Sequence, residues 1–163
     1  MDTTRRSLLK GALAVAVTSR LVSASEPPAK ALIQRVIPST GERIPVVGIG
    51  TNAYDVESPQ DLAARREVLR DFPALGGRVI DSARGYGRSE AVIGQLLSEL
   101  GSRDRYFIAT KPVSAPQADS VINRQLLDES FTSLRVKVID LMQVHSLVRS
   151  DDLMPLLREY KQE

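Results

Sequence analysis

Four ionisable residues occupy positions from which they could act together on one ligand. Asp81, Lys111 and His145 each follow a short apolar run that is typical of a buried strand. Tyr86 comes five residues after Asp81. The carboxyl ends of parallel strands meet at one edge of a sheet, and that edge carries the active site in parallel α/β folds. The sequence therefore predicts an active site built from a carboxylate, a phenol, an ammonium and an imidazole.

Each of these residues also has an ordinary structural explanation. Asp81 can cap a loop, Tyr86 can lie on the surface, and Lys111 can be solvated at a strand end. A lone histidine such as His145 is often a hydrogen-bonded residue near the edge of a core. Only their joint placement favours a functional site. With one histidine and no cysteine, the chain is not expected to hold a metal ion or a disulfide.

Strand and helix patterns alternate from Leu32 onward. Two extended segments around a glycine-containing turn predict a β-hairpin at residues 33–37 and 43–46. Strands are predicted next at residues 46–52, 78–81, 106–110 and 138–144. Apolar stripes at helical spacing predict helices that begin near Ser58, Ser89, Ala118 and Asp151. Pro73 is expected to end the first of these helices, and Gly101 the second.

This alternation indicates right-handed βαβ units around a parallel sheet. The 139 residues after position 24 can bury the core of one modest domain. They are fewer than the roughly 250 residues of a (β/α)8 barrel. Periodicity does not distinguish an open sheet from half of such a barrel. No helix-stop signal follows the segment from Asp151, so we expect the chain to end within a helix.

The first 24 residues have the pattern of a twin-arginine export signal. Arg5 and Arg6 precede an apolar run, residues 11–17, which is shorter than the roughly 20 residues that span a membrane. Residues 25–31 are polar and contain proline, as suits a linker. The folded domain is therefore expected at residues 32–163. The signal predicts a periplasmic protein that the twin-arginine machinery exports already folded.

Charge outside the export signal is nearly balanced. After position 24 the chain has 18 basic and 19 acidic residues. A net charge this small gives no electrostatic reason to expect a nucleic acid or an anionic membrane as a partner.

From Ile44 to Glu163 the chain resembles the aldo-keto reductases. Four motifs carry the resemblance: Gly48-Ile49-Gly50-Thr51; Val79-Ile80-Asp81-Ser82-Ala83 with Tyr86-Gly87-Arg88-Ser89-Glu90; Ile108-Ala109-Thr110-Lys111; and Leu141-Met142-Gln143-Val144-His145. The resemblance implies an α/β fold, the N-terminal half of a TIM (β/α)8 barrel, with four βα units preceded by a β-hairpin. Pro73, Ser82 and Ser146 are small departures from the family pattern. The large departure is that the second half of the barrel has no counterpart.

The resemblance also implies NADPH-dependent reduction of an aldehyde or ketone. By resemblance, the catalytic tetrad is Asp81, Tyr86, Lys111 and His145. Tyr86 would donate a proton to the carbonyl oxygen. An ordinary phenol ionises only near pH ~10, so the Lys111 ammonium would favour the phenolate, with Asp81 holding that ammonium in place. His145 would orient the carbonyl. The positions that match NADP(H)-binding residues are Gly50, Thr51, Asn52 and Asp81.

Two functions from different classes remain open. One is an oxidoreductase present as its N-terminal half, which we expect to be inactive alone and to act on a small carbonyl substrate when complete. The other is a non-catalytic binding module of barrel fold, or an inert truncated product. A sheet that stops after four strands also leaves both outer strands with unpaired backbone groups, so self-association is expected.

Overall fold

The computed structural model describes residues 32–112, 120–147 and 149–162. Its elements are, in chain order, β1 (Gln34–Val36), β2 (Arg43–Pro45), β3 (Gly48–Gly50), α1 (Pro59–Asp71), β4 (Val79–Asp81), α2 (Ser89–Leu100), η1 (Arg103–Arg105), β5 (Phe107–Thr110), α3 (Ser120–Leu134), β6 (Leu141–Met142), η2 (His145–Leu147) and α4 (Ser150–Tyr160). The predicted export signal and linker lie outside the described residues. In the described ranges, no helix is both long and apolar enough to cross a membrane.

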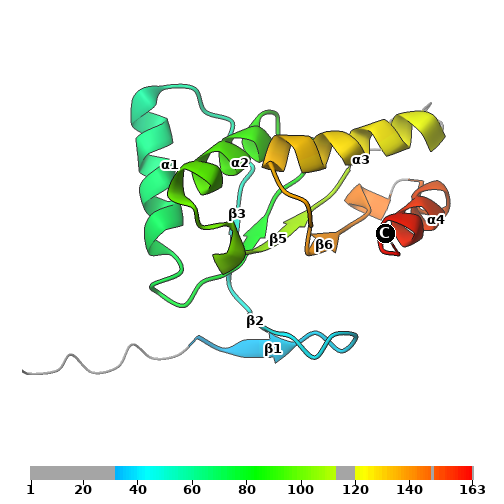
Figure 1. Ribbon diagram of the computed structural model, residues 1–163, viewed down its shortest axis with the longest axis horizontal. Coiled ribbons are helices and arrows are strands. Elements are labelled where there is room, and N and C mark those ends of the chain that lie inside the picture. Colours follow the sequence, from blue (N-terminus) through cyan, green and yellow to red (C-terminus); the bar gives the residue numbers. More distant parts are fainter. Residues whose placement is uncertain (1–31, 113–119, 148, 163) are drawn as a thin grey trace, which may run out of the picture.

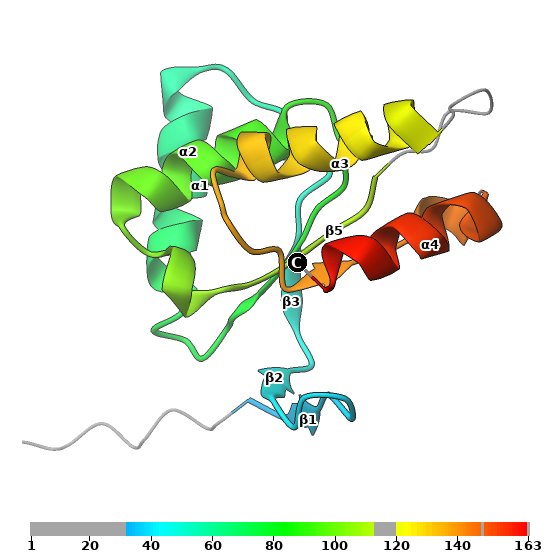
Figure 2. The same cartoon turned by 45° about the vertical axis from the view of Figure 1, so that its right-hand side comes forward.

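The four strands that follow the hairpin form one parallel sheet in the order β3-β4-β5-β6. Gly50 pairs with Asp81, and Asp81 pairs with Ala109, so these strands end at the same edge. Helices α1, α2 and α3 lie on one side of the sheet, and α4 lies beside β6 (Figures 1 and 2). The predicted fold class, a hairpin followed by parallel βα units as in half of a TIM barrel, is confirmed.

The main core lies between the sheet and helices α1 and α2. Ile80 of β4 and Ile108 of β5 are fully buried against apolar side chains of those helices. Burying a side chain of this size contributes roughly 1.5–3 kcal/mol. The predicted stripe of α2 is buried from Val92 to Leu97, and the helix ends at Gly101, which has a φ of 57°. This left-handed backbone favours glycine.

Helix α3 presents a different face to the core from the one its apolar residues predict. Val121 and Ile122 are 72% and 44% exposed, whereas the polar residues Asn123 and Ser130 are buried. Ser130 donates a hydrogen bond to the buried carboxylate of Glu90 on α2. Leu127 and Leu134 are buried on the same face, so the core-facing side of α3 combines apolar packing with a polar contact to α2.

Strand β6 is shorter than the predicted strand at residues 138–144. It pairs with β5 only at Leu141 and Met142. Just before these residues, the Asp140 carboxylate accepts the backbone N–H of Ile108 at 2.8 Å. The Asp140 side chain therefore accepts from a backbone N–H of β5 that would donate to β6 if the pairing of the two strands extended further. Helix α4 ends at Tyr160, and Lys161 and Gln162, the last described residues, form a turn.

The β1–β2 hairpin lies at the amino ends of the sheet strands, away from the edge predicted to carry the site (Figure 1). Glu42 in its turn accepts a hydrogen bond at 3.0 Å from Arg78, which immediately precedes β4. Val46 and Val47, between the hairpin and β3, are 53% and 56% exposed. The contact between Glu42 and Arg78 thus joins the hairpin to the sheet, while the segment between β2 and β3 leaves two apolar side chains exposed to solvent.

Tyr106 compensates for a missing backbone bond at the end of α1. The carbonyl of Leu69 would accept from the residue four positions later, but that residue is Pro73, which has no N–H. The hydroxyl of Tyr106, just before β5, donates to this carbonyl instead. Both residues are almost completely buried. Burial raises the pKa of Tyr106 to about 12.

We expect Tyr106→Phe to lower the free energy of unfolding by about 1–3 kcal/mol near neutral pH, because it leaves a buried carbonyl without a donor. The tyrosine's pKa is higher in the folded state than its unfolded value near ~10, so this contribution is complete below that pH. It is lost as pH rises through the folded pKa of about 12. Urea unfolding of wild type and of Tyr106→Phe should be measured between pH ~10 and the folded pKa of about 12. The two free energies of unfolding should converge over this range; a constant difference would contradict the hydrogen bond from Tyr106 to Leu69.

Candidate active site

Asp81 and Lys111 form the centre of the predicted site. Asp81 is the last residue of β4, and Lys111 immediately follows the neighbouring strand β5. The Lys111 Nζ donates to both carboxylate oxygens of Asp81 at 2.8 Å, and to the backbone carbonyl of Ser82 at 2.6 Å. The Lys111 side chain is 13% exposed and that of Asp81 is 42% exposed. The ammonium is therefore held under a carboxylate that remains open to solvent.

Tyr86 lies over this ion pair on the loop between β4 and α2. The Lys111 Nζ is 5.3 Å from the centre of the Tyr86 ring. The Tyr86 N–H donates to Ala83 at 3.0 Å, and the Tyr86 carbonyl accepts from Ser89 at 3.1 Å. Gly87 has a φ of 59°, and a Cβ there would come within 2.2 Å of the Asp55 carboxylate. The loop conformation that presents Tyr86 therefore requires glycine at position 87.

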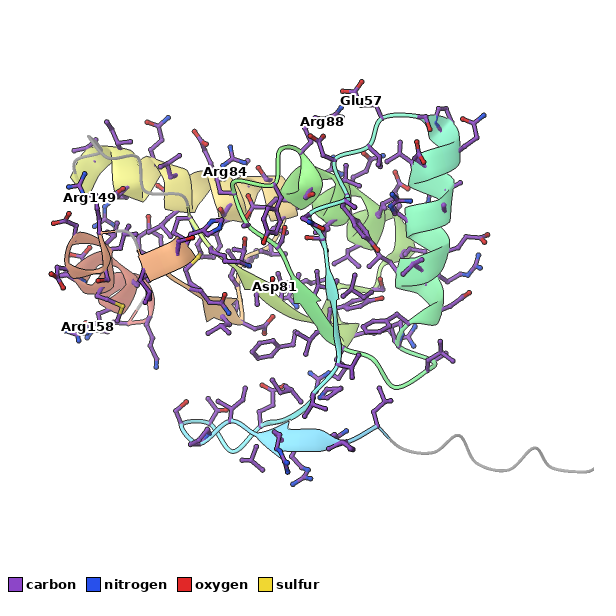
Figure 3. The ribbon with its side chains drawn as sticks, turned by 180° about the vertical axis from the view of Figure 1, so that it is seen from behind. Glu57, Asp81, Arg84, Arg88, Arg149 and Arg158 are labelled. Carbon is purple, nitrogen blue, oxygen red and sulfur yellow. The ribbon has the colours of Figure 1, made fainter. Side chains whose placement is uncertain are left out.

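His145 approaches Tyr86 from the end of β6. The two rings meet edge to face, with centroids 6.1 Å apart and planes at 85°. The buried Nδ1 of His145 has no hydrogen-bond partner among the described residues. Buried ring nitrogens are normally paired, so this atom is an exception to the usual pairing of buried polar groups. The structure thus brings the four side chains together at one edge; Figure 3 shows Asp81 there, at the end of β4.

The residues that match cofactor-binding positions lie beside Asp81 at the end of β3. Gly50 pairs with Asp81, and a Cβ built on Gly50 meets nothing within 4 Å. Asn52 is exposed. Thr51 is fully buried, and its hydroxyl donates to the Asp81 carbonyl at 3.0 Å. Gly50 and Asn52 therefore border open space, while the Thr51 side chain is used to hold the Asp81 backbone.

Comparison with known proteins supports what this geometry indicates. The model of the Aldo/keto reductase family matches residues 46–163. The chain belongs to the aldo/keto reductase family. Aldo-keto reductase YhdN of Bacillus subtilis is 30% identical to it, over 67% of this chain and 36% of that protein. The chain spans between about a quarter and about a third of the length of the curated relatives it matches.

Solved aldo-keto reductase structures also superpose on the chain. A candidate aldo-keto reductase from Pseudomonas aeruginosa is 26% identical, with a TM-score of 0.70 over 82% of this chain and 58% of that one. An aldo/keto reductase from Klebsiella pneumoniae, solved with NADP and acetate, is also 26% identical. Its TM-score is 0.55 over 64% of this chain and 36% of that one.

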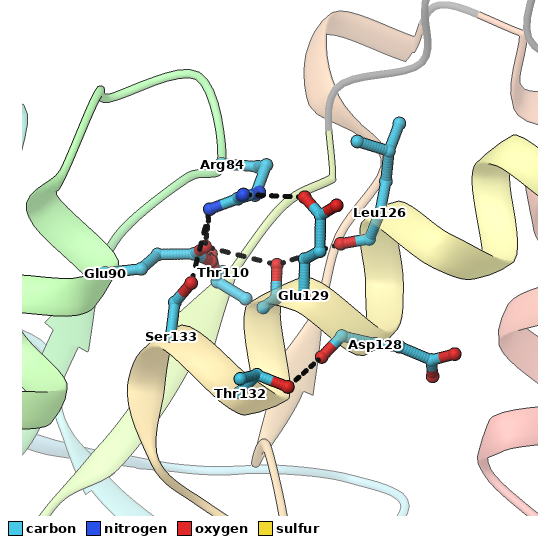
Figure 4. A network of polar contacts seen from close by, with 9 residues as sticks. Arg84, Glu90, Thr110, Leu126, Asp128, Glu129, Thr132 and Ser133 are labelled. Carbon is cyan, nitrogen blue, oxygen red and sulfur yellow. Dashed lines mark hydrogen bonds and ion pairs between the residues drawn. The ribbon is translucent and has the colours of Figure 1, made fainter.

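Sequence reasoning missed a polar network behind the site of this aldo/keto reductase chain. Glu90 of α2 is fully buried and contacts Arg84, Thr110 and Ser130 (Figure 4). One signal was available in the sequence. Glu90 lies three and seven residues before Ile93 and Leu97, on the buried stripe of the helix, where a carboxylate is out of place.

The described residues include no cluster of His, Cys, Asp or Glu side chains that could hold a metal ion. A cavity of about 670 Å³ is present, but no residue of the tetrad lines it. It is bordered by the hairpin, the strands β5 and β6, and helices α3 and α4, with Phe107, Leu141 and Met154 among its lining. Its lining reaches as far as Val144, the residue before His145.

Proposed function

We propose that this chain supplies the catalytic residues for reduction of an aldehyde or ketone by NADPH. The contact that carries the proposal is the bidentate pair of Lys111 and Asp81 directly beneath the Tyr86 ring. A structural ion pair has no need of a phenol and an unpaired imidazole nitrogen converging on it. Ionisable groups collected at the carboxyl edge of a parallel sheet are typical of an active site.

Each side chain has a role that fits its surroundings. The O–H bond of Tyr86 breaks and its proton moves to the carbonyl oxygen as that oxygen gains negative charge. Lys111 stabilises the phenolate that remains, and Asp81 holds the ammonium in place with both carboxylate oxygens. His145, whose ring meets that of Tyr86 edge to face, orients the substrate carbonyl. The nicotinamide cofactor, when bound, supplies the hydride to the carbonyl carbon.

The residues present fit the nicotinamide end of such a cofactor. Gly50 and Asn52 border open space next to the solvent-exposed carboxylate of Asp81, so a flat ring can approach the backbone there. The structures from Klebsiella pneumoniae and from Bombyx mori were solved with NADP. These observations support NADP(H) as the cofactor, held partly by Gly50, Asn52 and Asp81, with Thr51 acting through the Asp81 backbone.

We expect the 163-residue chain to be inactive alone, and a chimaeric barrel tests the function. Residues 32–162 would be followed by the part of the Pseudomonas aeruginosa protein that the match does not cover. The chimaera should consume NADPH when given an aromatic aldehyde, whereas the chain alone should not. Turnover would support the oxidoreductase. A folded chimaera that binds NADPH without reducing any of a panel of aldehydes and ketones would favour the non-catalytic binding module.

Export remains a proposal supported by the sequence alone. The paired Arg5 and Arg6 ahead of an apolar run support the twin-arginine route to the periplasm, which would carry the protein already folded with its cofactor. We expect the mature protein in a periplasmic fraction to begin after Ala24. Recovery of the whole protein in the cytoplasm, with Arg5 and Arg6 still present, would overturn this proposal.

A further inference from the structure

Glu90 is a buried carboxylate that the proposed chemistry does not use. Its side chain is 1% exposed, at the start of α2. Thr110 donates to one carboxylate oxygen at 2.7 Å. Arg84 and Ser130 donate to the other at 3.4 and 3.3 Å (Figure 4). Three donors from three different segments thus meet at a single side chain.

Stability alone does not account for a carboxylate at this position. Taking a carboxylate out of water costs several kcal/mol, and an apolar residue in its place is often neutral or stabilising. A negative charge in the first turn of a helix recovers only about 0.3–1 kcal/mol from the helix dipole. The ion pair with Arg84 is long, at 3.4 Å. The carboxylate therefore points to a requirement other than stability.

The groups that Glu90 holds are directly connected to the site. Thr110 is the residue before Lys111. Arg84 is on the loop of Tyr86, two residues earlier, and its backbone N–H donates to the carbonyl of Lys111 at 3.0 Å. One carboxylate thus joins the strand end that carries the ammonium to the loop that carries the phenol.

The network continues from Arg84 to α3. The Arg84 guanidinium also donates to Glu129 at 2.6 Å and to Ser133 at 3.4 Å. The hydrogen bond from Arg84 to Glu129 holds the pKa of the Glu129 carboxyl below its ordinary value. Glu129 is 38% exposed, so water can replace its contact. Glu90 has no such substitute, which makes it the member of the network on which the arrangement depends.

We propose that Glu90 is a positioning residue that fixes Tyr86 relative to Lys111 and His145 by binding Thr110 and Arg84 at the same time. The inference rests on the proposed function, because it names Glu90 as the residue that aligns Tyr86, the proposed proton donor. It concerns an arrangement of side chains, however, and that arrangement can be measured without NADPH and without turnover.

The single histidine of the chain provides the measurement. In the 163-residue chain, prepared without a histidine tag, the ring C–H signals of His145 are unique in a proton NMR spectrum. The Tyr86 ring lies edge to face with His145, so its ring current shifts these signals. Tyr86→Leu gives the position of the signals without that ring. The difference in His145 signal position between wild type and Tyr86→Leu is therefore the reference scale against which a displacement of the Tyr86 ring is measured.

We expect Glu90→Gln to move the His145 signals by at least half of that scale, because the amide has one accepting oxygen and cannot accept from Thr110 on one side and from Arg84 and Ser130 on the other. Thr110→Val removes only the hydroxyl that Glu90 accepts from and should move the signals in the same direction. The matched control is Glu99→Gln, the same change on the same helix. Glu99 is exposed and bound to Arg66, so the signals should remain at the wild-type position.

His145 signals at the wild-type position in both Glu90→Gln and Thr110→Val would overturn the proposal. An equal shift in Glu99→Gln would also overturn it, because the effect would then be a general response to lost charge. If Glu90→Gln fails to fold, Thr110→Val decides alone, since it leaves the carboxylate in place. An inactive chimaera would defeat the proposed function without changing any of these outcomes.

Discussion

Replacing Tyr86 by phenylalanine should lower the turnover number of the chimaeric barrel by about 10²–10⁴-fold, the range that a positioned proton donor contributes. The phenyl ring keeps the contact with His145 and the place above Lys111, so only the hydroxyl is removed. Binding of NADPH should remain within about twofold, which corresponds to less than ~0.5 kcal/mol. Steady-state kinetics with an aromatic aldehyde and a fluorescence titration of NADPH measure the two effects separately.

Tyr160→Phe is the matched control for this substitution. The Tyr160 hydroxyl donates to Asp128 at 2.6 Å, on helices that do not carry the tetrad. The control removes one phenolic hydroxyl and should leave turnover close to that of the parent chimaera. Turnover of Tyr86→Phe equal to the parent would exclude Tyr86 as the proton donor, whatever the outcome for the cofactor.

The 163-residue chain alone should sediment as dimers or larger species and should bind NADPH at least about 100-fold more weakly than the chimaera, a difference of ~2.7 kcal/mol. Within the described ranges, β3 and β6 each pair with only one neighbouring strand. Open strand edges present unpaired N–H and C=O groups that invite association. Val138 and Leu141 add apolar surface at the β6 edge, with 63% and 42% of each exposed.

A charge at this edge tests the association. Leu141→Lys places an ammonium on the outer strand, a common means by which natural edge strands avoid pairing. We expect sedimentation to show a shift toward monomer in this variant. Val121→Lys, on the solvent-exposed part of α3, is the control and should sediment like wild type. A monomeric wild-type chain that binds NADPH as tightly as the chimaera would refute the prediction.

Much of the fold follows from local sequence signals. Ser58 and Pro59 begin α1 as predicted, with the Ser58 side chain accepting the Asp61 N–H. The apolar stripe of α2 and its stop at Gly101 were equally clear. Short apolar runs, each followed by a polar residue, located the ends of β4 and β5, whereas β3 and β6 end two residues earlier than predicted. Because parallel strands end at a common edge, these signals also predicted that Asp81, Lys111 and His145 would converge.

What the sequence left undetermined depends on contacts between distant segments. The core-facing side of α3 includes Ser130 because Glu90 accepts its hydroxyl there. At the start of β6, Asp140 takes the N–H of Ile108. These contacts join residues 40 and 32 positions apart, so no local periodicity records them.

The same division holds within the site. The types and spacing of Asp81, Tyr86, Lys111 and His145 were enough to nominate them. Their alignment was not evident, because it depends on Glu90, which bonds both the strand before Lys111 and the loop before Tyr86. A buried carboxylate is tolerated only where a folded structure supplies its donors. Three-dimensional packing therefore decides how the four side chains face one another.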